Sequence, residues 1–80
     1  MDNLPYIDKK RTGENLKRLM RLKRITISQM QLKLGMASGT IIYAWCRGDR
    51  VPSPDHLVQL AYILDCDLSE LIITEVPENE

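Results

Sequence analysis

Eighty residues, 44% of them hydrophobic, suffice for one compact core and exclude a second domain of similar size. No apolar run approaches the roughly 18 residues of a membrane-spanning helix, and the start MDNLPYIDKK lacks the apolar core of a secretory signal. The two cysteines, Cys46 and Cys66, lie far apart, so we expect reduced thiols in a cytosolic protein rather than a disulfide scaffold.

The net charge is zero, but the charges are separated along the chain. Residues 1–50 hold all eleven Lys and Arg and only four Asp and Glu, a net charge of +7, whereas residues 51–80 hold seven acids and no Lys or Arg, a net charge of −7. Chance sorting of solvated helix surfaces is one explanation. The complete separation of the basic residues instead favours one face for a polyanion and another that avoids it.

Five short helices and no strand are predicted, so the expected fold is an all-α bundle. The first helix is predicted to begin at Thr12, a residue type favoured at the N-cap. Leu16, Leu19 and Met20 follow at helical spacing and form its buried stripe. Residues 1–11 are then an N-terminal arm.

The second helix is predicted to begin at Thr26, because Thr26 and Gln29 have the S/T-x-x-E/Q spacing of a capping box. Met30 and Leu34 are expected to face inward from this helix. Gly35 is expected to end it, since glycine is the usual residue at a helix C-terminus.

The third helix lies in the stretch GMASGTIIYAWCRG and follows a turn of a few residues, with Ser38 as its expected cap. At about 100° per residue, Ile42 and Trp45 share the inner face, and Gly48 ends the helix. The outer face is predicted to carry, without any acidic residue, Thr40, Tyr43, Ala44 and Arg47.

The fourth helix has Pro54 at its favoured first position. Its apolar stripe consists of Leu57, Leu60, Ala61 and Leu64. In the short fifth helix, Asp67 is the expected cap and Glu70 completes a second capping box. The predicted domain therefore spans residues 12–73, and the acidic residues 74–80 form a loose tail.

The short connection between the second and third helices is typical of a helix-turn-helix, whose second helix fits the major groove of DNA. Thr40 and Ala44 are small enough for close approach to base edges and thymine methyl groups, while Arg47 and Arg50 suit phosphates or a guanine edge. The N-terminus of the second helix suits a phosphate. The predicted DNA-binding residues are Thr26, Ser28, Gln29, Ser38, Gly39, Thr40, Tyr43, Ala44, Arg47 and Arg50.

With these elements in register, residues 13 to about 73 resemble the lambda-repressor-like (Cro/repressor-type, XRE) helix-turn-helix family. The similar segments are 13–19, 26–35, Ile42 with the W-x-x-G of 45–48, 51–53 and 57–61. The resemblance implies a five-helix bundle that binds DNA through its third helix, as a homodimer on an inverted repeat.

Three positions depart from the family pattern. Ile27 replaces a glutamine that binds phosphate in relatives, which moves the polar contacts to its neighbours. Gly39 stands where many relatives have a long polar residue that reads bases. Arg24 stands where a glycine or asparagine often ends the first helix, so either this arginine is left-handed, at a cost of about 1 kcal/mol, or the turn differs.

Several side chains allow a structural as well as a functional interpretation. Trp45 has the register of a core residue. Tyr43 either reaches a phosphate or leans on the second helix, and Arg47 either contacts DNA or pairs with Asp49. The basic run 9–11 either follows the DNA backbone or is a solvated charge run.

No metal-ligand spacing, nucleophile–histidine–acid order or glycine-rich phosphate loop is found, so we expect neither a cofactor nor an enzyme. Cys46, beside Arg47, is the one candidate for a redox-sensitive thiol.

These observations predict a sequence-specific DNA-binding transcriptional regulator, with a repressor as the favoured type. It would act as a homodimer on double-stranded DNA in the bacterial cytoplasm, at the nucleoid, without a membrane or a small-molecule ligand. The alternative is an antitoxin-like protein-interaction module with secondary DNA binding, whose contact would be marked by an exposed patch of Ile27 and Ile41. The dimer surface is expected near the fifth helix. The spare apolar residues there either form this surface or cover the core; they are Leu4, Tyr6 and Ile7 at the start of the chain and Ile73 and Val76 at its end.

Overall fold

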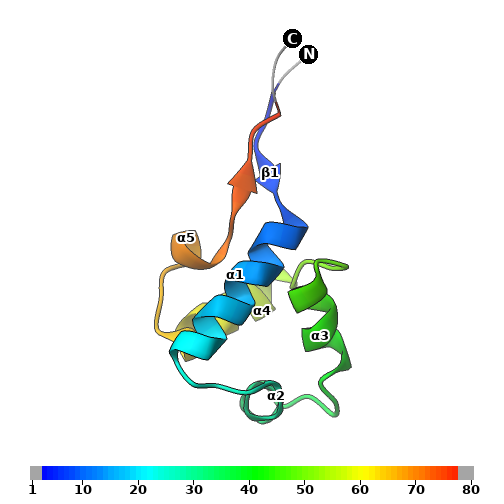
Figure 1. Ribbon diagram of the computed structural model, residues 1–80, viewed down its shortest axis with the longest axis vertical. Coiled ribbons are helices and arrows are strands. Elements are labelled where there is room, and N and C mark those ends of the chain that lie inside the picture. The colour runs from blue at the N-terminus through cyan, green and yellow to red at the C-terminus, as the bar shows by residue number, and fades with distance from the viewer. Residues whose placement is uncertain (1–2, 78–80) are drawn as a thin grey trace.

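The computed structural model describes residues 3–77 and confirms the predicted all-α class, with a small two-stranded ribbon added (Figure 1). The helices are α1 (Lys9–Leu22), α2 (Ile27–Leu34), α3 (Thr40–Arg47), α4 (Pro54–Leu64) and α5 (Leu68–Leu71). The strands β1 (Tyr6–Ile7) and β2 (Thr74–Glu75) pair antiparallel, with Tyr6 opposite Glu75. Within residues 3–77, no helix is both long and apolar enough to cross a membrane.

The five helices enclose one apolar core, and the ribbon extends away from it beyond the first turn of α1 (Figure 1). The predicted inward-facing residues of the first four helices meet in this core, and α5 adds Leu71, whereas Leu68, also expected to point inward, is exposed. Its fully buried large side chains are Leu16, Met30, Ile42, Leu60, Leu64 and Leu71. Trp45 is also buried, beside the ring of His56 at a centroid distance of 5.1 Å, so its core interpretation is confirmed.

Two glycines allow α1 and the C-terminal end of α3 to approach with almost no side chain between them. A Cβ atom at Gly13 would lie 2.2 Å from the carbonyl oxygen of Trp45, and one at Gly48 would lie 2.6 Å from the Cα of Lys10. Gly48 also has φ +83°, a left-handed conformation that glycine adopts without strain. The position of α3 is therefore set by direct backbone contact with α1.

The first helix begins earlier than predicted. Asp8 is its N-cap and accepts the Arg11 N–H at 2.9 Å, so the helix starts at Lys9. Thr12, the predicted cap, is instead buried in the first turns, where its hydroxyl donates to the Ile73 carbonyl at 3.2 Å and accepts the Ile73 N–H at 2.9 Å. The basic residues 9–11 are consequently helical and do not form an extended arm.

The strands also correct the predicted arm (1–11) and loose tail (74–80). Segments from both pair with each other, and the Arg11 guanidinium lies 3.4 Å from the Glu75 carboxylate. Local sequence gave no signal for this pairing, because it joins residues almost at opposite ends of the chain. The last three residues of the predicted tail lie outside the described residues.

The local signals for helix ends are mostly confirmed. The Thr26 hydroxyl accepts the Gln29 N–H at 3.1 Å and the Gln29 side chain accepts the Thr26 N–H at 2.8 Å, which is the predicted capping box. Gly35 ends α2 in the left-handed conformation, with φ +69°. The Glu70 carboxylate accepts the Asp67 N–H at 2.8 Å at the start of α5.

Replacing Gly13 by alanine is expected to destabilise the domain by at least about 3 kcal/mol, because two backbones would have to separate. Gly35→Ala is the matched control: its Cβ would meet no atom within 4 Å, so only the left-handed strain of about 1 kcal/mol remains. Urea unfolding followed by circular dichroism measures both. Equal losses for the two variants would contradict the tight α1–α3 contact.

The backbone of Arg24 is in the left-handed conformation, with φ +58°, which is the first of the two predicted alternatives. Arg24→Gly is therefore expected to be about 0.5–1 kcal/mol more stable than Arg24→Ala, because both remove the charge but only glycine removes the strain. Thermal unfolding of the two variants measures the difference, and an alanine variant as stable as the glycine variant would contradict the assigned strain.

Candidate nucleic-acid interface

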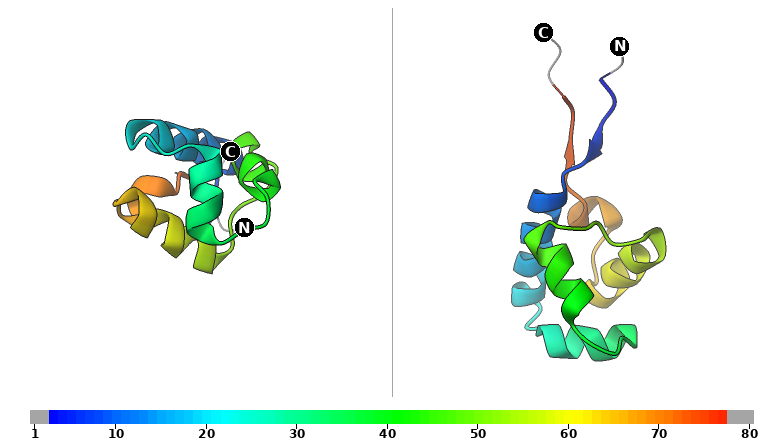
Figure 2. Two further views of the ribbon diagram at one scale, coloured as in Figure 1. Left: turned by 90° about the horizontal axis from the view of Figure 1, so that it is seen from below. Right: turned by 90° about the vertical axis from the view of Figure 1, so that its right-hand side faces the viewer.

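Helices α2 and α3 are joined by a five-residue turn and lie at a steep angle to each other, as the right-hand view of Figure 2 shows. The turn is held to α2 by two hydrogen bonds between Gln31 and Met36. The Met36 N–H donates to the Gln31 carbonyl at 3.0 Å, and the Gln31 side-chain amide donates to the Met36 carbonyl at 3.3 Å. This arrangement is the predicted helix-turn-helix.

The solvent-facing side of α3 carries one exposed side chain per turn. Thr40, Tyr43 and Arg47 are exposed, and we call them the α3 ridge. Ile42 and Trp45 anchor the opposite side of the helix in the core. Since α3 contains no acidic residue, the ridge is compatible with a polyanion along its whole length.

Ala44 does not belong to the ridge, and its predicted place on the exposed face is wrong. It is only 8% exposed. The helical angle was correct, but the α2–α3 turn and the segment after α3 cover this flank. Ala44 lines an open hollow, which we call the turn-side hollow, together with Met36, Ala37, Ser38, Thr40, Ile41 and Arg50.

Ser38 is not the N-cap of α3. Gly39 is the cap and makes no side-chain hydrogen bond in that role. The Ser38 hydroxyl instead donates to the Thr40 hydroxyl at 3.2 Å and accepts the Thr40 N–H at a long 3.4 Å. Ser38 and Thr40 are thereby held together at the start of the ridge.

Gly39 and Ile27 pack against each other. A Cβ atom at Gly39 would lie 2.8 Å from the Cγ2 methyl of Ile27, so the isoleucine fills the space that a side chain at position 39 would need. This Cβ atom would point toward α2. Its next nearest atoms would belong to Tyr43 of α3 and Gln31 of α2. Two departures from the family pattern are thus one packing feature, and Gly39 brings backbone rather than a side chain to the surface.

The N-terminus of α2 brings the predicted Thr26, Ser28 and Gln29 together at the surface. Thr26 and Gln29 bind each other in the capping box, and Ser28 is exposed. Among residues 3–77, the N–H groups of Ile27 and Ser28 have no acceptor, as expected for the first turn of a helix. The helix dipole adds to these donors, so this end of α2 suits an anion.

The two predicted arginines differ in their surroundings. The Arg47 guanidinium lies 2.9 Å from the Asp49 carboxylate, and both side chains are more than half exposed. The predicted salt bridge is therefore formed, although an exposed pair of this kind contributes at most about 1 kcal/mol. Arg50 is exposed at the edge of the turn-side hollow and has no ion-pair partner within residues 3–77.

Lys17 was not among the predicted site residues, yet the structure places it beside the ridge. It lines a second hollow, the α1-side hollow, together with Ile27, Tyr43, Cys46 and Arg47. The signal in the sequence that could have identified Lys17 is its position one helical turn after Gly13, the glycine at which α1 contacts α3. Basic side chains thus flank the ridge on both sides, Lys17 on one and Arg50 on the other.

Two further predictions fail on burial. Ile27 and Ile41 are both half-buried against the core and line different hollows, so they do not form the exposed apolar patch that a protein contact would need. Cys46 is buried, and burial raises the pKa of its thiol against the opposing charges of Lys17 and Arg47. A buried, protonated thiol does not meet the requirements of a redox sensor.

Comparison with known proteins assigns this fold to a class of DNA-binding domains. The model of the Cro/C1-type HTH DNA-binding domain matches residues 15–77. No match was found among curated proteins. The chain therefore belongs to the Cro/C1-type helix-turn-helix family and is a DNA-binding domain of the kind found in regulators, as the resemblance implied.

Solved structures agree with this assignment. The restriction-modification controller protein C.AhdI from Aeromonas hydrophila is 26% identical, with a TM-score of 0.72 over 82% of this chain and 98% of its own. Two structures of the BldD DNA-binding domain are each 19% identical and each cover 82% of this chain. The first has a TM-score of 0.71 over 94% of its own length, and the second, from S. venezulae, has a TM-score of 0.70 over 97% of its own length. The latter likeness supports the fold alone.

Asp49→Asn is expected to raise the affinity for any duplex about two- to five-fold, because it releases Arg47 and removes a negative charge beside the ridge. Asp55→Asn, on α4, is the matched control, since it makes the same charge change away from the ridge. Fluorescence anisotropy with a labelled duplex between 50 and 200 mM salt (an ordinary range for such assays) measures both. Equal effects of the two variants would contradict the position of the ridge.

Proposed function

We propose that this chain is a sequence-specific transcriptional regulator, with repression as its mode of action, and that the α3 ridge enters the major groove. The observation that carries the proposal is the exposed, acid-free ridge of Thr40, Tyr43 and Arg47 with a basic side chain on either flank. A convex helix face with uncharged readers at its centre and cations at its borders suits a groove lined by phosphates.

Each part of the interface has a separate task in this arrangement. Thr40 and Tyr43 are placed to meet base edges, the hydroxyl of Thr40 as donor or acceptor and its methyl beside thymine. The N-terminus of α2, Lys17 and Arg50 meet phosphates on the two sides of the groove. Arg47 exchanges its ion pair with Asp49 for a phosphate contact. This exchange costs little free energy, because the pair is exposed and screened by water and counter-ions.

Repression would follow from occlusion of the promoter. Two copies bound to half-sites about 34 Å apart would cover one face of the duplex and block polymerase. The similarity to a restriction-modification controller supports regulation as the task. In this role the chain acts in the cytoplasm of a bacterium, at the nucleoid, and needs no cofactor, small-molecule ligand or catalytic centre.

Selection of bound duplexes from a random library at near-physiological salt is expected to enrich an inverted repeat. Thr40→Val should then change the preferred base at one position of each half-site, with roughly ten-fold weaker binding to the original operator, because only a hydroxyl group is lost. Thr74→Val, an exposed threonine on β2, is the matched control and should select the parent operator. A folded protein that enriches no sequence would contradict the proposal and favour the protein-interaction module.

Arg50→Ala is expected to weaken binding to all duplexes alike and to flatten the salt dependence by about one unit, because it removes one phosphate contact. The same anisotropy titrations measure this slope. An unchanged slope with an unchanged affinity would remove Arg50 from the interface.

A further inference from the structure

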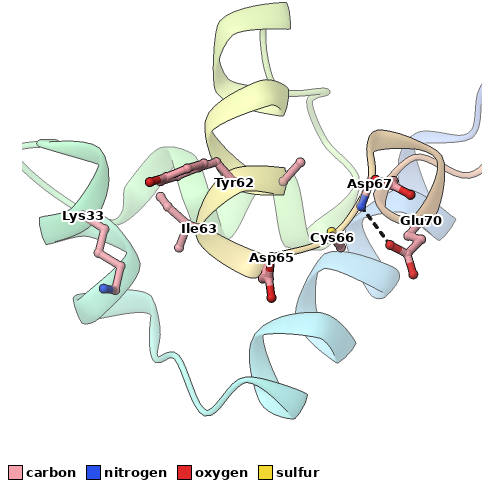
Figure 3. A pocket seen from close by; sticks show the side chains of 8 residues that line it. Lys33, Tyr62, Ile63, Asp65, Cys66, Asp67 and Glu70 are labelled. Atoms are coloured by element: carbon pink, nitrogen blue, oxygen red, sulfur yellow. Dashed lines mark hydrogen bonds between the residues drawn. The ribbon is translucent and has the colours of Figure 1, made fainter.

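The hollows on the surface differ in the charges that line them. In the hollow beside α4 and α5, Figure 3 shows Lys33 on one side and three acids on the other, which are Asp65, Asp67 and Glu70. Among the described residues, the α1-side hollow is lined by two bases and no acid. A polyanion can therefore approach the α1-side hollow, and Tyr43 is the uncharged residue of the α3 ridge that lines it.

The ring of Tyr43 leans back along α3 toward the start of the helix, as long side chains in helices do. Its Cε2 atom lies 3.7 Å from the point that a Cβ atom of Gly39, one turn earlier, would occupy. The Cγ2 methyl of Ile27 lies 2.8 Å from the same point, so the ring and the methyl group share the space above the glycine. We call Ile27 and Gly39 the tyrosine seat.

The tyrosine seat is fixed to α2 and to the core. Ile27 is half-buried and packs against the core cluster. The Oε1 atom of Gln31 lies 3.8 Å from the Cβ point of Gly39, and the amide of the same side chain is held by the Met36 carbonyl. Gly39 has φ −88°, a value that any residue adopts, so its missing side chain provides space rather than a special backbone conformation.

A side chain that is held before binding has two advantages at a base-reading surface. It loses less conformational entropy when the duplex binds, because its orientation is already fixed. It also brings the same polar group to the same base edge in every complex, which direct readout in the major groove requires. Tyr43 is 53% exposed, so its ring can rest on the seat while part of the side chain stays open to DNA.

We propose that Ile27 and Gly39 are positioning residues for base recognition. They hold Tyr43 so that its hydroxyl group contacts one base pair of each half-site, distinct from the base pair that Thr40 contacts. The inference rests on the proposed function and adds to it two residues that act on the base through the tyrosine.

Selection from a random duplex library measures the base preference of each variant. Tyr43→Phe should lose the preference at one position of each half-site and bind the parent operator about five-fold more weakly, because one hydrogen bond is lost. Ile27→Ala should lose the preference at the same position. Ile27→Val should keep it, since valine retains a methyl group facing Gly39. Gly39→Ala should act like Ile27→Ala, because its Cβ atom would displace the methyl group from the seat.

A double variant separates positioning from a merely structural role. If Ile27 acts through the tyrosine hydroxyl, Ile27→Ala with Tyr43→Phe should bind the parent operator within about two-fold of Tyr43→Phe alone, because contacts that depend on each other are not additive. The matched control is Ile72→Ala, another half-buried isoleucine that packs against the core, which should leave the base preference unchanged. Circular dichroism shows whether each variant is folded.

The tyrosine seat can also be observed without DNA. Nuclear Overhauser effects in the isotope-labelled parent should connect the Cγ2 methyl protons of Ile27 with the ring protons of Tyr43. Their absence from the folded parent would overturn the inference, whatever DNA the chain binds. So would a folded Ile27→Ala that keeps the preference lost in Tyr43→Phe, or effects that multiply in the double variant. A folded parent that shows the contact but enriches no sequence would overturn the proposed function and, with it, the reading role of the seat.

Discussion

The backbone contact between α1 and α3 is the constraint on which the DNA-facing surface depends. Gly13 has no side chain where it meets the carbonyl oxygens of α3, and Gly48 has none where it meets the backbone of α1. Because the contact involves two helical backbones, α3 cannot slide or rotate without breaking it. The inner anchors Ile42 and Trp45 then fix the rotation of the helix, and the ridge points outward as a consequence.

The separation of charge along the sequence becomes a separation in space. The bases beside the ridge come from α1 and from the segment after α3, while α4 and α5 carry acids and no Lys or Arg. A duplex held at the ridge therefore meets bases on both flanks, with Asp49 also beside the ridge, where it pairs with Arg47. The zero net charge of the whole chain describes neither surface, because local potential at a face rather than the total decides association with a polyanion.

The sequence predicted the fold well wherever the signal was local. The capping boxes at Thr26 and at Asp67, the glycine ends and the helical stripes all depend on residues within one or two turns of each other, and they were placed correctly. Apart from the Ser38 cap, which Gly39 replaces, the errors in the bounds of helices and strands arose where distant residues decide. Thr12 is a poorer cap than expected because Ile73 binds its hydroxyl, and the two strands exist only because the chain ends meet.

The same limit applied to the site. The exposure of Thr40, Tyr43, Arg47 and Arg50 followed from helical angle and position, so the sequence identified them. Ala44 had the correct angle, but a neighbouring turn covers it, and such cover depends on tertiary packing. Lys17 was missed for the converse reason, since only the α1–α3 contact brings it to the ridge. Side chains that one helix presents alone are predictable, whereas those completed by a second element are not.

The position of the interface can be tested most directly by recording backbone amide chemical shifts while the operator duplex is titrated into the isotope-labelled chain. We expect the largest changes on the α3 ridge, on the first turn of α2 and around Arg50, and small changes on the outer face of α4. Large changes on α4 and α5 with an unaffected α3 would contradict this position of the interface, because DNA would then bind the acidic side of the molecule.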